Sequence, residues 1–324
     1  MLPGMSSTKI LLARSEEPNG LRSALTSGEL VRLRRGAYMP AADDGAGRPG
    51  SDAGRARARA LDHARAVHAQ VRAPHVFSHA TAALIWGLRL WAVSDVTHLR
   101  QRSKPGGDRA ADIARHVGLP AQHGIVDGLP VTSLEQTVLD CALTMPVLDA
   151  LVVADAALGQ GLREREVRQR LADVRKPNGT ARAACVLGLM DGGSQSAWET
   201  WLRYVAARLG LPRPVLQYPV ATHLGVYRID LAWPEQRVLA EFDGQVKYTD
   251  GAFGRGYDGR RALVEEKRRE DAIAEALGVR PVRFMAVDAR DPEAVARRLL
   301  ARFPPDVRAA ARPDRRLPRP TPPR

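Results

Sequence analysis

Residues 225–244 read GVYRIDLAWPEQRVLAEFDG, and the hydrophobic pattern of this stretch decides the fold of the C-terminal part of the chain. Two runs of alternating apolar and polar residues flank residues 234–237, whose composition is typical of a tight turn. With Glu235 and Gln236 as the loop residues, the stretch forms a hairpin with one wholly apolar face. On the other face, Asp230 and Glu241 lie directly opposite each other on the two strands. A one-residue slip would mix the two faces, so the pattern fixes the register.

The acidic side chains of this hairpin are candidate metal ligands. Directly opposed residues have Cβ atoms about 4.5–5.5 Å apart, so Asp230 and Glu241 repel each other, and Asp243 adds a third negative charge to the same face. A divalent cation would neutralise them, and carboxylate oxygens suit Mg²⁺ or Mn²⁺. The alternative is that Arg228, which opposes Asp243, and other arginines pair these acids on a solvated face.

Helices are expected on both sides of this hairpin in the sequence. Residues 194–209 carry an apolar stripe at helical spacing, and Glu199 beside the stripe is placed to reach the acidic face of the sheet. The pattern Ser196-x-x-Glu199 is equally a capping box, which serves the helix alone. A second, charged helix over residues 265–277 precedes a strand over 279–284, and Lys267 on its first turns is a candidate cation for the acids.

Composition narrows the class of protein and of partner. The 324 residues are 44% hydrophobic and 26% charged, which is typical of a globular chain with about two domains. Two cysteines exclude a disulfide framework and a four-cysteine zinc site. No apolar run reaches a membrane span, and the N-terminal apolar stretch is too short for a secretory signal, so a cytoplasmic protein is expected. The net charge of +13 favours DNA as a partner, although arginine-rich composition alone also produces such a charge.

Composition shifts divide the chain into four segments. Residues 1–54 hold a short helix, a basic hairpin over residues 30–38 and a loop of turn-forming residues from position 41. Residues 55–190 alternate helices and short strands, with a helical pattern over 134–158 that Met145-Pro146 interrupts. The main boundary is expected at residues 191–194, followed by the segment 194–303 with the hairpin. Residues 304–324 form a basic, proline-rich tail that we expect to be disordered.

Three separated motifs of the C-terminal segment resemble the PD-(D/E)XK nuclease superfamily, and more narrowly its Vsr-like (very-short-patch-repair type) endonuclease-domain proteins of actinobacteria. The motifs are Asp230-Leu-Ala-Trp-Pro234, Glu241-Phe-Asp-Gly244 and Glu266-Lys-Arg-Arg-Glu-Asp271. The resemblance implies an α/β fold whose C-terminal domain is a restriction-endonuclease-like mixed sheet flanked by helices. It also implies that Asp230 and Glu241 hold a divalent metal, with Glu199 and Asp243 as further ligands. The superfamily's lysine is replaced here by Asp243, so the positive group would come from Lys247 or Lys267.

A second resemblance concerns the first 190 residues. Residues 21–40, LRSALTSGELVRLRRGAYMP, are similar to the end of the winged helix-turn-helix of AbiEi-type antitoxins, and residues 75–87 and 129–140 are similar to the α/β middle part of those proteins. The resemblance implies phosphate contacts by Arg32, Arg34 and Arg35. The alternative is a basic hairpin that only packs on the middle region. His75 and His79 have the i, i+4 spacing of a metal pair, but without a third ligand in the pattern the interpretation as ordinary structural histidines is favoured.

Two functions therefore remain as expectations. The first is a Mg²⁺- or Mn²⁺-dependent endodeoxyribonuclease with an antitoxin-like DNA-binding region, in which Asp230, Glu241 and Asp243 act with Lys247 or Lys267. The second is a non-catalytic DNA-binding regulator, such as the antitoxin of a type IV toxin–antitoxin pair, with a degenerate nuclease fold and a possible toxin partner. The sequence leaves the oligomeric state and the DNA preference open.

Overall fold

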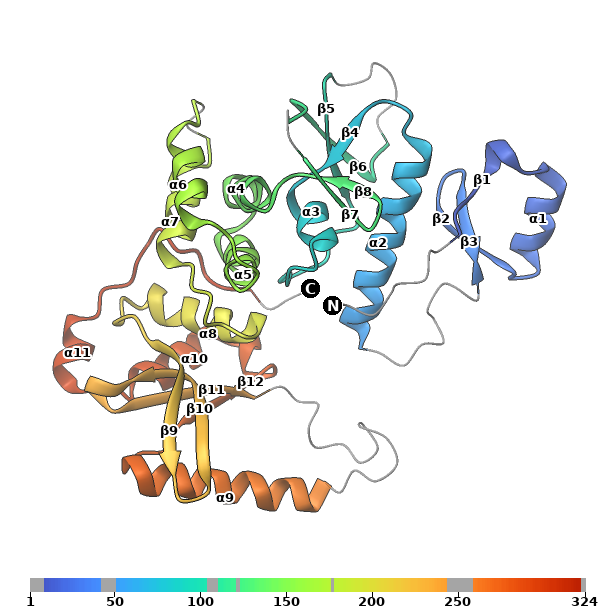
Figure 1. The fold of residues 1–324 in the computed structure, drawn as a ribbon. Helices are drawn as coiled ribbons and strands as arrows, with labels where there is room; N and C mark the ends of the chain where they lie inside the picture. The colour runs from blue at the N-terminus through green and yellow to red at the C-terminus, as the bar shows by residue number, and fades with distance from the viewer. Residues whose placement is uncertain are drawn as a thin grey trace. The chain divides into compact units, whose positions relative to one another are not determined.

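The computed structural model describes residues 9–41, 51–103, 110–120, 123–175, 178–243 and 259–321, with the side chains of 259–263 left out of the description. It confirms a mixed α/β fold, with three sheets and the helices that accompany them (Figure 1). The chain divides into two compact units, residues 1–141 with 163–170, and residues 142–162 with 171–324. None of the described helices combines the length and the apolar character that crossing a membrane requires.

The expected basic hairpin forms near the N-terminus of the first unit. Strands β2 (Leu30–Arg34) and β3 (Ala37–Pro40) pair antiparallel, and β1 (Leu11–Leu12) adds to β3. Gly36 in the turn has a φ of +78°, which glycine adopts without steric cost. The short helix α1 (Pro18–Thr26) precedes the hairpin, as predicted.

A five-stranded sheet forms the centre of the first unit, in the order β6-β5-β4-β8-β7. Its strands are β4 (His75–Phe77), β5 (Thr97–Gln101), β6 (Ile113–Val117), β7 (Gly124–Val126) and β8 (Leu129–Val131). Helices α2 (Asp52–Gln70) and α3 (His79–Ile85) pack on it around Phe77, Leu99 and Val131. The N-cap of α2 is the hydroxyl of Ser51, which accepts a hydrogen bond from the Gly54 N–H.

The predicted helical stretch is broken where proline interrupts it, into α4 (Leu134–Thr144) and α5 (Val147–Leu158). Two further helices, α6 (Glu164–Ala172) and α7 (Thr180–Leu189), follow. Contrary to the boundary expected at 191–194, α5 and α7 belong to the C-terminal unit. The physical reason is a buried ion pair, since Asp155 on α5 binds Arg203 on α8 (Ala197–Arg208) at 2.6 Å and accepts a hydrogen bond from the Thr200 hydroxyl.

The C-terminal sheet has the order β12-β11-β10-β9 and the register expected of the hairpin. Its strands are β9 (Val215–Thr222), β10 (Gly225–Trp233), β11 (Val238–Asp243) and β12 (Val282–Met285). Leu231 pairs with Ala240 and Ala232 with Leu239, and the same register opposes Asp230 and Glu241. The turn is a 3₁₀ turn over Pro234–Gln236 that ends at Arg237, whose φ is +54°. Strand β9, which the sequence did not predict, pairs antiparallel with β10.

Helices cover both faces of this mixed sheet (Figure 1). Helix α8 and helix α10 (Pro292–Leu300) lie on one face, and α9 (Gly259–Leu277) lies on the other. Because β12 runs parallel to β11, α9 is the connection that returns the chain to the same end of the sheet. Ala232, Leu239 and Ile273 form the core beneath α9.

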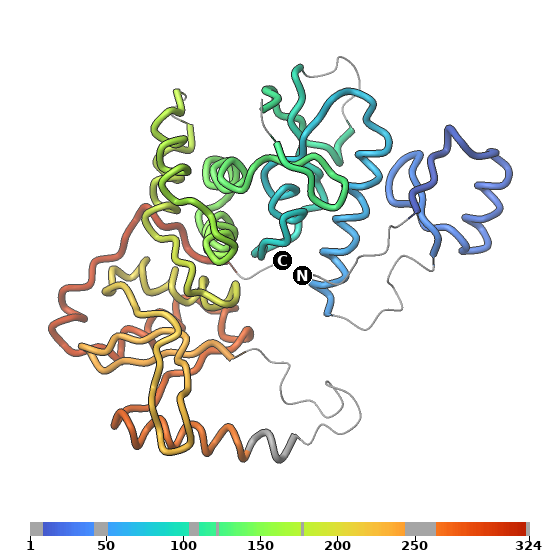
Figure 2. Tube along the Cα trace, in the orientation of Figure 1, coloured from blue at the N-terminus to red at the C-terminus, as the bar shows by residue number. Residues whose placement is uncertain are grey.

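The prediction of a disordered tail is wrong for the residues up to 321. Figure 2 traces this segment as the red end of the tube, with helix α11 (Pro305–Ala310) at its start. Leu317 is only 3% exposed, and the Tyr204 hydroxyl donates a hydrogen bond of 2.8 Å to the Pro318 carbonyl. The tail therefore packs on α8. Burial of the Leu317 side chain and the backbone hydrogen bonds of the segment stabilise this packing despite the polar composition of the tail.

Candidate functional site

The candidate site is a group of acidic side chains on the C-terminal sheet and on α8. Asp230 on β10 is half-buried, and its Oδ2 accepts a hydrogen bond of 2.8 Å from the backbone N–H of Phe242 on the opposed strand. Its Oδ1 lies 3.4 Å from Nε2 of Gln217 on β9. The carboxylate of Asp230 is thus held in place by donors from both neighbouring strands.

Glu199 on α8 joins this group through a shared glutamine. Its Oε2 accepts hydrogen bonds from Gln217 Nε2 at 3.0 Å and from the Gln195 backbone N–H at 2.8 Å. The Ser196 hydroxyl accepts the Glu199 N–H at 3.1 Å, so the N-cap that the sequence indicated is present as well. Both interpretations of Glu199 hold together, because one side chain helps to close the helix N-terminus and also faces Asp230 across Gln217. Gln217 itself, with a φ of +49°, was not predicted.

Glu241 on β11 is 6% exposed and carries two arginine partners. Arg269 on α9 donates to its Oε1, and Arg283 on β12 lies 3.5 Å from its Oε2. Arg283 also lies 3.9 Å from Oδ2 of Asp243, and both arginines bind Glu266. The expected pairing of the acids with arginines is therefore present, but it is made by Arg269 and Arg283. Arg228 donates to the Gln217 carbonyl oxygen at 3.0 Å.

The electrostatics of this group follow from burial. Burial raises the pKa of Glu199, and the negative charge of Asp230 raises it further. Burial also raises the pKa of Glu241, with Arg269 and Arg283 acting in the opposite direction and Asp230 adding to the rise. The negative charge of Asp230 thus acts on both buried glutamates.

The positive groups of the site differ from those that the sequence indicated. Lys267 is exposed on α9, and Lys247 lies outside the described residues. Arg269 lies two positions after Lys267 on the same helix. Residues at i and i+2 point to different sides of a helix, so Arg269 faces the sheet whereas Lys267 does not. The sequence does not single out Arg269, because the run Glu266–Asp271 contains three basic residues in succession. Only the orientation of α9 against the sheet shows which of them contacts the acids.

A second group of side chains is arranged more closely for metal binding. Among the residues that the structure describes, the three that are placed to hold an ion are His79, His98 and His116, whose ligand atoms lie within 4.8 Å of one another. Glu199, Asp230, Glu241 and Asp243 do not form such a group in this part of the chain. The sequence spacing paired His79 with His75, and it did not indicate His98 and His116, because the three histidines lie on separate elements with no regular spacing.

The three arginines predicted to contact phosphates differ in their surroundings. Arg34 is bound to Asp112 through two hydrogen bonds of 2.8 and 3.1 Å, so it ties the hairpin to the loop before β6. The Arg34 guanidinium and the His63 ring lower the pKa of Asp112 to about 2, with the Arg34 hydrogen bond as the main cause. Arg32 and Arg35 are exposed.

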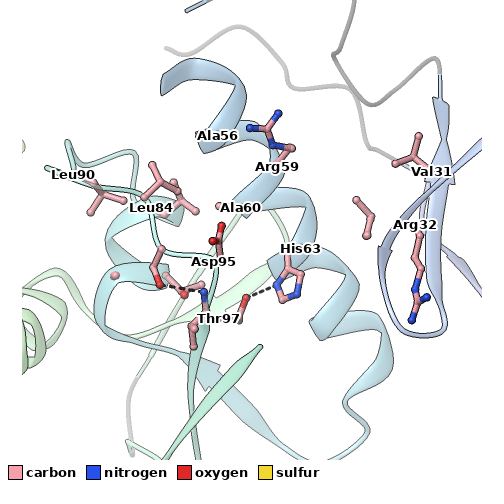
Figure 3. A pocket seen from close by; sticks show the side chains of 16 residues that line it. Val31, Arg32, Ala56, Arg59, Ala60, His63, Leu84, Leu90, Asp95 and Thr97 are labelled. Carbon is pink, nitrogen blue, oxygen red and sulfur yellow. Dashed lines mark hydrogen bonds between the residues drawn. The ribbon is translucent and has the colours of Figure 1, made fainter. Parts of the chain in front are cut away.

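A cavity of about 370 Å³ lies beside this hairpin (Figure 3). Arg32 on β2 and Arg59 on α2 contribute its guanidinium groups, and Asp95 lies in the loop before β5. His63 borders the cavity, with Nδ1 2.7 Å from the Thr97 hydroxyl and Nε2 2.9 Å from Asp112. Of the arginines predicted to bind DNA, Arg32 lines this cavity.

Comparisons with known proteins find similarity over part of the chain. No described protein family matches it. Over 120 residues it is 35% identical to two proteins of Mycobacterium tuberculosis, "Uncharacterized protein MT2308" of strain CDC 1551 / Oshkosh and "Uncharacterized protein Rv2248" of strain ATCC 25618 / H37Rv. The match covers 36% of this chain and 44% of each relative, so the chain spans less than half the length of these curated relatives.

One solved structure is also similar, the crystal structure of the RV2827C protein from Mycobacterium tuberculosis. It is 15% identical, with a TM-score of 0.35, and the similarity covers 55% of this chain and 71% of that chain. A likeness at this level carries no argument about function.

Proposed function

We propose that the C-terminal sheet carries a metal-dependent site for hydrolysis of DNA phosphodiester bonds. The observation that carries this proposal is the gathering of Glu199, Asp230 and Glu241, from three separate elements, around the opposed pair of strands β10 and β11. Glu199 and Glu241 are buried. Arg269 and Arg283 compensate Glu241, whereas burial of Glu199 beside Asp230 is costly unless a cation compensates that pair. Net charge supports the choice of substrate, because a chain with a charge of +13 attracts polyanions.

The donor chemistry of this site fits Mg²⁺ or Mn²⁺. Glu199, Asp230 and Glu241 offer carboxylate oxygens, with Asp243 as a further donor, and such oxygens are the ligands that these hard cations prefer. The chemistry supplied by such an ion, when bound, is Lewis acidity toward the phosphodiester.

The residues of the chain have distinct tasks in this proposal. The Phe242 N–H and Gln217 orient Asp230, and Gln217 fixes the distance between Asp230 and Glu199. Arg269 and Arg283 oppose the rise in the pKa of Glu241 that its burial causes. In this proposal the same two guanidinium groups take the part of the superfamily's lysine and stabilise negative charge on a phosphate.

Nicking of supercoiled plasmid in Mg²⁺ or Mn²⁺ tests this function. We expect cleavage by the wild type, loss of cleavage in Asp230→Asn, and retention in the matched control Asp271→Asn, an acid on α9 that pairs with Arg280 instead. Equal activity in the wild type and in Asp230→Asn would mean a contaminating nuclease and would end the assignment.

The second candidate function is a non-catalytic DNA-binding regulator, such as an antitoxin with a toxin partner. The pairing of Glu241 with both Arg269 and Arg283 favours it, because these cations already neutralise the acid. DNA binding that weakens steeply with salt, with no cleavage in any divalent metal, would support this candidate over the first. Both candidates place the protein in the cytoplasm.

A further inference from the structure

Three histidines from separate elements of the first unit converge at one edge of its central sheet. His79 is the first residue of α3, His98 lies on β5, and His116 lies on the neighbouring parallel strand β6. Nδ1 of His98 lies 3.1 Å from Nε2 of His116, and one ring nitrogen from each of the three falls within 4.8 Å of the others. The His79 and His116 rings stack with centroids 3.8 Å apart.

The observed separation suits a shared metal ion. Two nitrogens bound to a tetrahedral Zn²⁺ at about 2.0–2.1 Å lie about 3.3 Å from each other. The His98–His116 distance of 3.1 Å is close to that value. Two neutral imidazoles gain one hydrogen bond at this distance, whereas an ion between them would use both lone pairs.

An outer layer of hydrogen bonds orients His79. Its Nδ1 lies 2.9 Å from the Ser78 hydroxyl and 3.9 Å from Oδ2 of Asp140, which assigns Nε2 to an ion. Asp140 is fixed in turn by Arg100 at 2.5 and 3.1 Å and by Gln136 at 2.8 Å, so the charge of Arg100 is compensated. Metal-bound histidines commonly have a hydrogen-bond partner on the other ring nitrogen, and the Ser78 hydroxyl is that partner of His79.

The backbone at His79 supports the same interpretation. His79 has a φ of +54° at the start of a helix, a conformation that residues other than glycine rarely adopt. The ring of His75, its expected partner by spacing, instead lies 3.0 Å from His68. The conformation of His79 thus directs its ring toward His98 and His116 and away from His75.

We propose that His79, His98 and His116 form a Zn²⁺ site. Three imidazoles suit zinc, and they leave one position of a tetrahedral ion for a water molecule or another ligand. This site is separate in sequence from the carboxylates on the C-terminal sheet, and it stands whether or not those acids bind Mg²⁺.

Metal titration of the full chain tests the proposal. Protein stripped of metal should bind one equivalent of Zn²⁺ in competition with a chromophoric chelator, and Co²⁺ should give the visible bands of a four-coordinate site. We expect His98→Gln and His116→Gln, at half-buried positions, to weaken Zn²⁺ binding by more than about 100-fold and to abolish the Co²⁺ bands, since even loss of an outer partner costs 10–100-fold.

Two controls make the outcome decisive. His123→Gln, at an exposed histidine, should bind Zn²⁺ as the wild type does. Thermal unfolding should show that both cluster variants are folded, and Zn²⁺ should raise the midpoint of the wild type but not theirs. Folded wild type that binds no Zn²⁺, or folded cluster variants that bind it with unchanged affinity, would overturn the assignment.

Discussion

Replacing Arg269 with glutamine should tighten Mg²⁺ binding at the C-terminal carboxylates. Arg269 donates to Glu241 and also binds Glu266, so an incoming cation must compete with its guanidinium for the Glu241 oxygens. Without the Arg269 charge, the buried carboxylate of Glu241 is less well compensated. The site then repels Mg²⁺ less, so the ion should bind more tightly.

The magnitude follows from the charges and their exposure. Two unit charges about 4 Å apart interact by about 4 kcal/mol at the effective dielectric constant of about 20 that applies near protein surfaces. The side chains of Arg269 and Glu241 are 24% and 8% exposed, and Arg283 still lies 3.5 Å from Glu241, so about half of this energy is expected to be recovered. A gain of about 2 kcal/mol corresponds to a Kd lower by about 30-fold.

Calorimetric titration of Mg²⁺ into the wild type and Arg269→Gln measures this difference. Mg²⁺ is the appropriate ion because imidazole is a poor ligand for it, so the histidine cluster does not contribute. Arg268→Gln is the matched control, since Arg268 is the exposed neighbour on α9, and it should bind as the wild type does. Glu241→Gln combined with Arg269→Gln should abolish the gain. An affinity of Arg269→Gln within twofold of the wild type, or no binding by either, would refute Glu241 as a metal ligand.

Three further outcomes concern stability. Arg203→Met leaves Asp155 buried without its cation and should lower the free energy of unfolding in urea by about 3–5 kcal/mol; a loss under 1 kcal/mol would contradict the role assigned to this ion pair. Leu317→Ala should cost about 2–3 kcal/mol in the same assay, whereas Arg315→Ala, on the exposed side of the tail, should cost less than about 0.5 kcal/mol; equal costs would show that the tail does not pack. The folded-state pKa of Asp112 is about 2, below that of an unfolded aspartate, so its ion pair stabilises the fold above about pH 4 and this contribution is lost as the pH falls toward 2. Allowing for the partial exposure of Asp112, we expect the free energy of unfolding to fall between pH 5 and pH 2 by about 1 kcal/mol more in the wild type than in Asp112→Asn. Equal decreases in the two proteins would contradict the ion pair.

The parts of the fold that could be predicted are those that local pattern decides. The alternation of apolar and polar residues over 225–244 determines the strand register, because a one-residue slip would bury charged side chains. The structure has that register. Met145-Pro146 separates α4 from α5 because proline lacks the N–H that a continuing helix needs. Strand β9 was missed because Pro219 and the positive φ of Gln217 interrupt its alternation, and only pairing with β10 makes it a strand.

The candidate sites depend on contacts that sequence spacing does not record. Asp230 and Glu241 could be placed together because one hairpin holds both, and Glu199 because its helix directly precedes the sheet. Arg283 could not, since β12 reaches β11 only after the α9 crossover, and the choice of Arg269 over Lys267 depends on how α9 rotates against the sheet. His98 and His116 meet only through the pairing of β5 with β6, which nothing local specifies.

The packing of Leu317 and Pro318 against α8 has a practical consequence for preparing this protein. Proline-rich ends are routinely trimmed before crystallisation, and a chain cut after Phe303 would uncover the apolar surface beneath Leu317 and leave the Tyr204 hydroxyl without its carbonyl acceptor. Such a shortened protein should aggregate more readily than the full chain, so affinity tags and truncations are better placed at the other terminus.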